Sequence, residues 1–442
     1  MSLREKFVNP LIVYITHGYV VEAKNILKRF FGWKGSRQNV QPTLKEYGID
    51  VLVVNSLVPS IRLPVFSFSE LNRIIYPGTV ASTGKRNLHS IQDRWTWAMN
   101  FQKAVRISNT LVSLISPDSF GLCYVPNGKI VSAAVTVKSL RFLGYEVKIL
   151  ESGAKPDRLH VWNYSAQSQS EANKFLSLMW ENASLSDRES KSANYFNIRR
   201  SGLIQDPYHL VSWTKLTTSE LLPEFEYGKK VATFYSSSQI EQVGTDVIPA
   251  GNFQDQGEAL KSVLESLNPR DWVVYLRKHP IPPGAKSHFE DEDDIWTKTT
   301  GFNHLRIIKG DSKIDSFALA AKSNIVFHYN SSIGAEIIFA QLAPVITTGL
   351  TSWATLNAGY SALNSHELRD VLNTPELQIE NPQKILPWGL FHSELGTPFT
   401  LTTLGDQNTW KINGKNIHPN FKPHFINKIF KATLLLGWKR RN

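Results

Sequence analysis

Residues 324–349 read NIVFHYNSSIGAEIIFAQLAPVITTG. The β-branched and aromatic run IVFHY is followed by the polar group NSSIG, by a helix-like segment and by a second apolar run. Strand-forming residues that alternate with a helix of about ten residues are typical of a parallel βαβ unit. This stretch therefore predicts an α/β sheet.

The same alternation extends to both sides of this stretch. KKVATFYSSS (229–238) and DWVVYLRKHP (271–280) predict strands, and QGEALKSVLESLN (256–268) predicts a helix between them. SKIDSFALAAKS (312–323) and SHELRDVLN (365–373) predict two further helices. A doubly wound parallel sheet binds its ligands at the carboxyl ends of its strands, so the residues directly after each strand are the candidates for a site.

An α/β pattern also precedes this region. LCYVPNG (122–128), KIVSAAVTVKSLRFLG (129–144) and YEVKILESG (145–153) predict a strand, a helix and a strand. VLVVNSLVP (51–59) predicts another strand. The charged and serine-rich residues between about 185 and 225 predict a region that connects two domains.

Composition bounds the class of protein. A chain of 442 residues, 42% hydrophobic and 20% charged, is globular and is longer than one ordinary core. No run of about 20 apolar residues is present, and the single cysteine, Cys123, is typical of a reducing compartment, so we expect a cytoplasmic protein.

The formal net charge of +11 indicates an anionic partner, which is a nucleic acid, an acidic membrane surface or a phosphorylated small molecule. Residues 418–442 carry basic residues and no acidic ones, and their apolar residues recur at helical spacing. This segment is predicted to lie on anionic lipid at the inner face of the membrane, or to be a helix that packs on the protein.

Polar residues collect directly after three of the predicted strands. They are Ser236-Ser237-Ser238, Arg277-Lys278-His279-Pro280 and Asn330-Ser331-Ser332. We expect the three clusters to converge on one crevice, because the carboxyl ends of parallel strands meet at one edge of a sheet. Hydroxyls, two cations and an imidazole together indicate a clamp for a phosphate group.

The third cluster opens a predicted helix. Ser331 or Ser332 is expected to be its N-cap, and Gly334 leaves room for another group to come close. Glu336 is a candidate for hydrogen bonds with ribose hydroxyls, or an acidic residue that favours a helix N-terminus. Taken singly, each cluster also fits a cap, a turn or a solvated loop. Their repetition after three strands favours a site.

The sequence gives little support for an ATP site, a dinucleotide site or a metal site. Neither a Walker A phrase nor a GxGxxG phrase is present, which argues against an ATPase and against a dinucleotide oxidoreductase. The acidic run at 290–294 is typical of a solvated loop, so we expect no metal. His17, Asp118 and Asp246 are weaker candidates for contacts with a substrate.

At these residues the chain resembles the capsule polysaccharide biosynthesis glycosyltransferases, a Kdo-transferase-like family of GT-B type. Residues 229–370 contain a strand-plus-serines phrase (VATFYSSSQIE), an Arg-x-His-Pro phrase (277–280) and a Ser-Ser-x-Gly-x-Glu phrase (331–336) that are similar to those of the family.

The N-terminal half is similar to the family in two shorter phrases. Asn127-Gly128-Lys129 resembles the family's Asn-Gly-Arg, and Glu151-Ser152-Gly153 resembles its Glu-Arg-Gly. The chain departs from the pattern at Lys129 and Ser152, where the family has arginine, and at Asn330, where it has a small residue.

The resemblance implies two Rossmann-like domains with a cleft between them. Residues 1–220 would be the acceptor-side domain, 221–415 the nucleotide-sugar-binding domain and 416–442 a basic helix or tail. It also implies transfer without a metal and no cofactor besides a nucleotide-sugar co-substrate, for which a CMP-activated acid sugar is one candidate.

The resemblance also assigns roles. Arg277 and His279 would contact the donor phosphate, and Glu151 would face the cleft. From its position after the predicted strand VKIL we further hypothesise that Glu151 deprotonates or orients the acceptor, unless it is a structural carboxylate. The complete candidate set is Glu151 and His279 for catalysis; Ser236, Ser237, Arg277, Lys278, Ser331, Ser332, Gly334 and Glu336 for the donor; and Asn127 and Lys129 for the acceptor.

The leading hypothesis is a glycosyltransferase that moves a sugar from a nucleotide-sugar donor to a surface polysaccharide or a lipid-linked glycan. A nucleotide-sugar epimerase of the same fold would instead turn over with no acceptor present. A basic nucleic-acid-binding protein would explain the net charge, but no RNA- or DNA-binding signature is present, so we expect no nucleic-acid partner.

Overall fold

The computed structural model describes residues 12–14, 51–53, 65–83, 90–115, 121–154, 158–165, 168–200, 222–238, 248–279, 296–398, 402–404, 410–412 and 415–417. The chain divides into two compact units. Unit 1 comprises Met1–Thr83, Asn87–Ala166 and Gly396–Asn442, and unit 2 comprises Gly84–Arg86 and Gln167–Leu395.

The described strands of unit 2 form one six-stranded parallel sheet. Its order is β11-β10-β9-β6-β7-β8, which in chain order is the 3-2-1-4-5-6 arrangement of a doubly wound sheet. The strands are β6 (Lys230–Tyr235), β7 (Trp272–Arg277), β8 (Leu305–Ile308), β9 (Ile325–His328), β10 (Val345–Thr347) and β11 (Tyr360–Ser361). The expected α/β fold and Rossmann-like sheet are confirmed for this unit.

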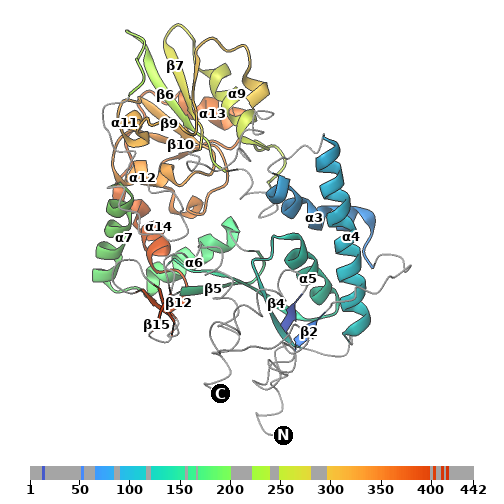
Figure 1. Cartoon of the computed structure of the whole chain (residues 1–442). Helices are drawn as coiled ribbons and strands as arrows, with labels where there is room; N and C mark the ends of the chain where they lie inside the picture. Colours follow the sequence, from blue (N-terminus) through green and yellow to red (C-terminus); the bar gives the residue numbers. More distant parts are fainter. Residues whose placement is uncertain are drawn as a thin grey trace. The chain divides into compact units, whose positions relative to one another are not determined.

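Helices cover both faces of this sheet. They are α9 (Gln256–Ser266), α11 (Ser316–Ala321), α12 (Ile333–Phe339) and α13 (Ser365–Leu372), with short 3-10 turns at Thr297–Thr299, Ala354–Leu356 and Pro382–Ile385. Asp255, Asp315 and Asn364 begin α9, α11 and α13 by accepting backbone N–H bonds with their side chains. Strand side chains such as Phe234 and Phe327 pack with α9 and α13, and Figure 1 shows α11 and α12 on the other side of the sheet.

Three helices extend unit 2 beyond its sheet: α6 (Gln169–Asn182), α7 (Leu185–Arg200) and α14 (Leu386–Glu394). α7 occupies residues 185–200, the first part of the region expected to connect two domains, and α6 and α7 both belong to unit 2. Phe196 of α7 is buried in a stack with Phe339 (ring centroids 4.4 Å apart) and Trp388 (5.9 Å). Aromatic contacts therefore hold a mostly polar helix against the rest of unit 2.

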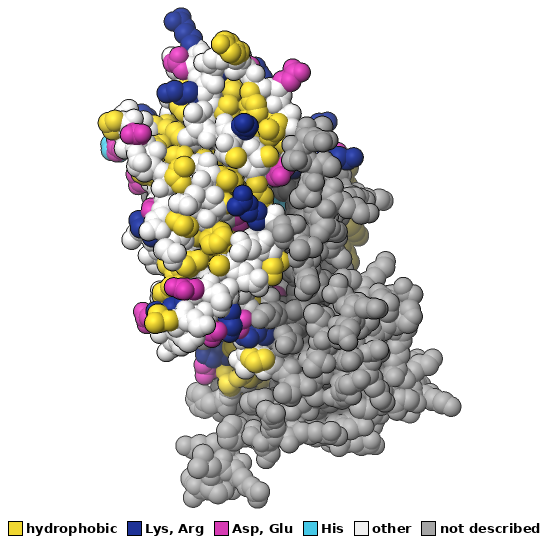
Figure 2. Space-filling model, turned by 90° about the vertical axis from the view of Figure 1, so that its left-hand side faces the viewer, with side chains coloured by type: hydrophobic (Ala, Val, Ile, Leu, Met, Phe, Trp, Pro, Cys, Tyr) yellow, Lys and Arg dark blue, Asp and Glu magenta, His cyan; other side chains and the backbone are white. Residues whose placement is uncertain are grey.

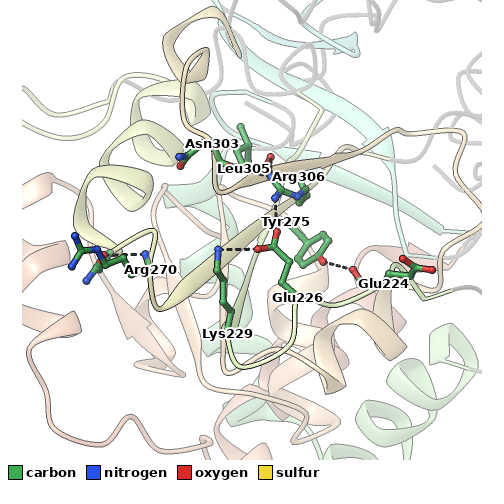
Figure 3. A network of polar contacts seen from close by, with 9 residues as sticks. Glu224, Glu226, Lys229, Arg270, Tyr275, Asn303, Leu305 and Arg306 are labelled. Carbon is green, nitrogen blue, oxygen red and sulfur yellow. Dashed lines mark hydrogen bonds and ion pairs between the residues drawn. The ribbon is translucent and has the colours of Figure 1, made fainter.

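A polar network fastens the segment that leads into β6 (Figure 3). Glu226 forms ion pairs with Lys229, at 2.8 Å, and with Arg306 of β8. The hydroxyl of Tyr275 in β7 donates a hydrogen bond to the carbonyl of Glu224 at 3.0 Å. The segment is thereby attached to β7 and β8, the strands on one side of β6.

Unit 1 contains a smaller, mixed sheet of order β12-β5-β4-β3. β3 (Leu122–Pro126), α5 (Val131–Phe142) and β4 (Glu146–Ser152) form the expected parallel βαβ unit. β5 (Arg158–Trp162) runs antiparallel to β4, and β12 (Thr397–Pro398) runs antiparallel to β5. The connection 153–157 is too short for a crossover, which takes about a dozen residues, so β5 returns beside β4 in the opposite direction.

Two helices and several short strands complete the described part of unit 1. α3 (Phe68–Thr83) and α4 (Ile91–Leu114) pack together and on α5. Pro77 lies inside α3, where Leu71, Ile75 and Val80 are buried. β1 (Ile12–Tyr14) pairs with β2 (Val51–Val53), and β13 (Thr402–Leu404), β14 (Trp410–Ile412) and β15 (Lys415–Ile417) form a small antiparallel sheet.

Candidate functional site

The switch point of the unit 2 sheet lies between β6 and β9. These neighbouring strands are the first and fourth of the sheet in chain order, and the connections that leave them lead to opposite edges of the sheet. Sheets of this order bind ligands outside the carboxyl ends of such a pair. Ser236–Ser238 follow β6 and Asn330–Ser332 follow β9, so two of the three predicted clusters border the switch point.

The serines after β6 connect the neighbouring loops. Ser236 Oγ accepts the backbone N–H of His279 at 2.7 Å, which brings the first and second predicted clusters together. The backbone N–H of Ser237 donates to Gln256 Oε1 at 2.9 Å, and Gln256 Nε2 donates to the Ser237 carbonyl at 3.1 Å. Ser236, Ser237 and Ser238 are all buried. These bonds connect Ser236 to the residues after β7 and Ser237 to the first residue of α9.

Arg277, a predicted phosphate contact, bonds to groups of the protein itself. Its buried guanidinium is directed at the loop between β8 and α11, where it bonds to the side chain of Ser316 and to three backbone carbonyls. Those carbonyls belong to Lys309, Ser312 (3.1 Å) and Ile314 (3.4 Å). Burial lowers the pKa of Arg277. Because carbonyl oxygens occupy its donors, Arg277 shapes the loop in this structure.

Lys278 and His279 lie one and two residues beyond the end of β7. Their side chains are partly exposed, whereas that of Arg277 is buried. The backbone N–H of Lys278 donates to the carbonyl of Ile308 at 2.9 Å, which continues the pairing with β8. Of the three residues in this cluster, Lys278 and His279 are the ones that could reach a ligand.

His328, the last residue of β9, is a site residue that the sequence analysis did not select. Its Nδ1 accepts the backbone N–H of Ser331 at 3.3 Å, and its Nε2 lies 2.9 Å from Thr347 Oγ1. A ring nitrogen that accepts carries no hydrogen, so Nε2 carries the proton and donates to Thr347. Burial lowers the pKa of His328 to about 3, and the imidazole is neutral.

Ser332 occupies the N-cap position of α12, as predicted, but its side chain makes no capping bond. The imidazole of His328 accepts the N–H of Ser331. Asn330 adopts a φ of 51°, in the left-handed region that asparagine tolerates. Ser331 and Ser332 are half-buried beside this turn.

Gly334 permits a close approach, as predicted, and the group that approaches belongs to the chain itself. A Cβ at this position would overlap Nε2 of His328 and would lie 2.5 Å from Cδ2 and 2.8 Å from Cε1 of that ring. Trp353 stacks on the imidazole, with ring centroids 5.5 Å apart and an angle of 28° between the planes. The ring is thus confined by Gly334 and by Trp353.

Glu336, a candidate for hydrogen bonds with a ribose, has a partner within the protein. Its buried carboxylate accepts a hydrogen bond from Arg199 Nε at 2.6 Å and forms an ion pair with that guanidinium. Arg199 lies in the last turn of α7, within the region that the sequence assigned to an interdomain connection. The contact joins α7 to the first turn of α12 and was not visible in the sequence, because 137 residues separate the pair.

The acceptor-side candidates of unit 1 also lie together. Asn127 Nδ2 donates to Glu151 Oε1 at 3.2 Å, at the carboxyl ends of the paired strands β3 and β4. Asn127 Oδ1 accepts the backbone N–H groups of Lys129 and Ile130, each at 3.1 Å, and so holds the turn before α5. Lys129 is partly exposed. His160, opposite Glu151 in β5, is buried, and burial lowers its pKa to about 4.

Several predicted features lie outside the described residues. They are His17, Asp118, Asp246, Pro280, the acidic run 290–294 and the basic segment 418–442. Within the part of the chain that the structure describes, no helix is long and apolar enough to cross a bilayer.

No protein-family model matches the sequence, and no curated protein matches it. Among solved structures, a UDP-GlcNAc 2-epimerase from Neisseria meningitidis is 11% identical over 97% of this chain and 100% of its own, with a TM-score of 0.30. An α,α-trehalose 6-phosphate synthase from Burkholderia multivorans is 11% identical over 97% of this chain and 96% of its own, with a TM-score of 0.35. The C-terminal domain of a group 1 glycosyl transferase (LpcC) from Francisella tularensis is 14% identical over 37% of this chain and 82% of its own, with a TM-score of 0.22. The chain is therefore distantly similar to an epimerase, a synthase and a transferase domain, and no family is assigned to it.

Proposed function

We propose that unit 2 binds a nucleotide sugar at the carboxyl edge of its sheet and that the protein transfers the sugar to an acceptor. One observation carries this proposal: β6 and β9 are neighbours at the switch point of a 3-2-1-4-5-6 sheet, and a group of serines follows each of them. Such an edge is where doubly wound sheets bind nucleotides. The loops that border it are held in place by Gln256 and His328.

In this proposal some residues contact the donor, and Arg277 positions a loop. Lys278 and His279 supply a cation and an imidazole for the leaving phosphate, and Ser331 and Ser332 supply hydroxyls. Charge that develops on the phosphate during transfer is stabilised most by donors whose positions are already fixed. Arg277 would act on the donor indirectly, through the loop whose carbonyls it binds.

In unit 1, Glu151 is the proposed base for the acceptor hydroxyl, with Asn127 orienting its carboxylate at 3.2 Å. A base must lie within hydrogen-bond reach of the proton it takes. The proposed acceptor is a surface polysaccharide or a lipid-linked glycan at the inner face of the cytoplasmic membrane, and capsule polysaccharide is the class that the sequence motifs favour. The proposed donor is a CMP-activated acid sugar, used without a metal.

Thermal unfolding with CMP, CDP, UDP and GDP, each with and without Mg²⁺, tests the donor site. A ligand that binds only the native state stabilises it by about 2.7 kcal/mol at a hundred times its Kd. We expect one nucleotide to raise the Tm, and His279→Ala to remove the rise while the protein stays folded. His366→Ala is the matched control, because His366 lies exposed on α13 and should leave the rise intact.

Turnover distinguishes the transferase from an epimerase. A transferase consumes the nucleotide sugar only when an acceptor glycan is added, whereas an epimerase converts it alone. Glu151→Gln should abolish transfer and leave the Tm shift by nucleotide unchanged. If none of the four nucleotides raised the Tm, the proposed donor site would be wrong.

A further inference from the structure

The outward side of α4 carries apolar residues where a surface helix ordinarily carries polar ones. Ile91, Trp95 and Met99 recur every four residues, and they are 89%, 68% and 49% exposed. At about 3.6 residues per turn and about 1.5 Å per residue they form one row about 12 Å long. Ala98, beside this row, is exposed as well.

The other side of α4 already accounts for the packing of the helix. Ala104, Ile107 and Leu111 are buried, and α4 packs on α3 and α5. Ser90 and Asp93 form a capping box at its start. Figure 1 shows α4 at the edge of unit 1, with α5 on one side of it. The exposed row therefore does not serve the core of unit 1.

A group of aromatic side chains adjoins the row. Phe68, the first residue of α3, lies with its ring centroid 5.7 Å from that of Trp97 and 5.1 Å from that of Phe101. Trp97 stacks on Phe101 at 5.2 Å, and Trp97 Nε1 donates to Asn72 Oδ1 at 2.8 Å. Phe68 is 63% exposed even so. The α3–α4 pair thus presents aromatic rings that its own contacts hold in place.

The exposed charges of this surface are positive. Arg94 and Arg106 of α4 and Arg73 of α3 are exposed. Asp93 is the only acidic residue of α4 and is buried in the capping box, and Glu70 of α3 accepts bonds from Ser67 and is half-buried. By contrast, the described face of the molecule in Figure 2 intersperses hydrophobic groups with charges of both signs.

We propose that the outer face of α4 docks on an anionic lipid surface; this face consists of Ile91, Arg94, Trp95, Ala98, Met99 and Arg106. The apolar row enters the boundary between headgroups and acyl chains, Trp95 lies at the interface, and the arginines contact headgroup phosphates. A nucleic acid would also attract the arginines, but it offers phosphates and flat bases and would leave Ile91 and Met99 in water. A lipid surface accepts both kinds of side chain, and docking does not depend on the sugar chemistry of unit 2.

Cosedimentation of the full chain with vesicles tests the proposal. One set of vesicles contains equal parts of phosphatidylglycerol and phosphatidylcholine, and the other contains phosphatidylcholine alone. We expect binding to the anionic set, and a loss of about tenfold or more in the Trp95→Gln/Met99→Gln variant, because two apolar side chains no longer leave water. Arg94→Gln/Arg106→Gln should weaken binding and reduce its dependence on salt.

A matched control replaces two exposed leucines elsewhere. Leu178 and Leu185 of unit 2 are 54% and 77% exposed, so Leu178→Gln/Leu185→Gln removes a comparable apolar area and should bind vesicles as the wild type does. The basic segment 418–442 is intact in every variant. Equal binding by the wild type and by Trp95→Gln/Met99→Gln would therefore assign lipid contact to another part of the chain and overturn the proposal.

A fluorescent label reports insertion directly. Cys123 is the only cysteine and is buried, so Met99→Cys can be labelled selectively in the folded protein with an environment-sensitive dye. The dye at position 99 should shift to the blue on anionic vesicles, and a dye at Leu185→Cys should not. No vesicle binding by the wild type, binding of RNA or DNA that Trp95→Gln/Met99→Gln abolishes, or a dimer that the same variant dissociates would each overturn the proposal.

Discussion

Replacing Gly334 by alanine tests the geometry around His328. The added Cβ would overlap Nε2 of the imidazole and would lie 2.5 and 2.8 Å from two other ring atoms. The ring cannot move aside at low cost, because it is fully buried, stacks on Trp353, and bonds to Thr347 and to the N–H of Ser331. Overpacking of this kind costs about 1–3 kcal/mol. We expect Gly334→Ala to lose that much free energy of unfolding.

Urea denaturation measures this loss of free energy when the signal reports the unfolding of unit 2. A double-mutant cycle isolates the cause, because the His328→Ala background removes the ring and should reduce the cost of Gly334→Ala to about 0.5 kcal/mol or less. Gly121→Ala is the matched control, since its Cβ would meet only the partly exposed side chain of Tyr145, at 3.3 Å. The same cost in both backgrounds, or no cost in the wild type, would refute the packing described for this loop.

Three further predictions follow from buried groups. Burial lowers the pKa of His328 to about 3, below its ordinary 6.5, so the unfolded chain takes the proton first and stability falls as the pH drops below 6.5. The loss between pH 7 and pH 5 should be about 2 kcal/mol, and denaturation of His328→Asn at both values should show a smaller one. Arg277→Lys should lose about 1–3 kcal/mol on denaturation, because one ammonium cannot serve the carbonyls of Ser312 and Ile314 together; wild-type stability would contradict that role. Burial raises the pKa of Cys123 to about 11, so iodoacetamide should modify it only after unfolding, and labelling of the native protein at neutral pH would contradict its burial.

Local patterns in the sequence were sufficient to predict most strands and helices of unit 2. β6, α9, β7, β9, α12, β10 and α13 all lie within predicted segments, because each has its own apolar period and its own terminal residues. β8 (LRII) and β11 (YS), the two edge strands of the sheet, were not predicted. Neither is buried along its whole length, whereas β9 and β10 are and therefore read as continuous apolar runs. In unit 1, α3 and α4 were not predicted. Proline disfavours a helix interior, but Pro77 lies inside α3, where burial of Leu71 and Ile75 sustains the helix.

The sequence indicated which polar residues follow the strands but not the contacts that they make. Ser236 and His279 lie together as expected, and Asn127 also contacts Glu151. His328 was passed over, because a histidine at the end of a strand carries no sign in the sequence of being neutral and buried.

The sequence by itself determined the α/β alternation and the position of polar residues after the strands, because both depend on neighbours a few residues apart. Only the tertiary structure decided which partner each polar group binds. A guanidinium bonds to carbonyl oxygens as readily as to a phosphate, and Arg277 bonds to the loop at 309–316 because the pairing of β7 with β8 brings that loop beside it. Glu336 binds Arg199 because α7 packs near α12, a contact between residues far apart in the chain.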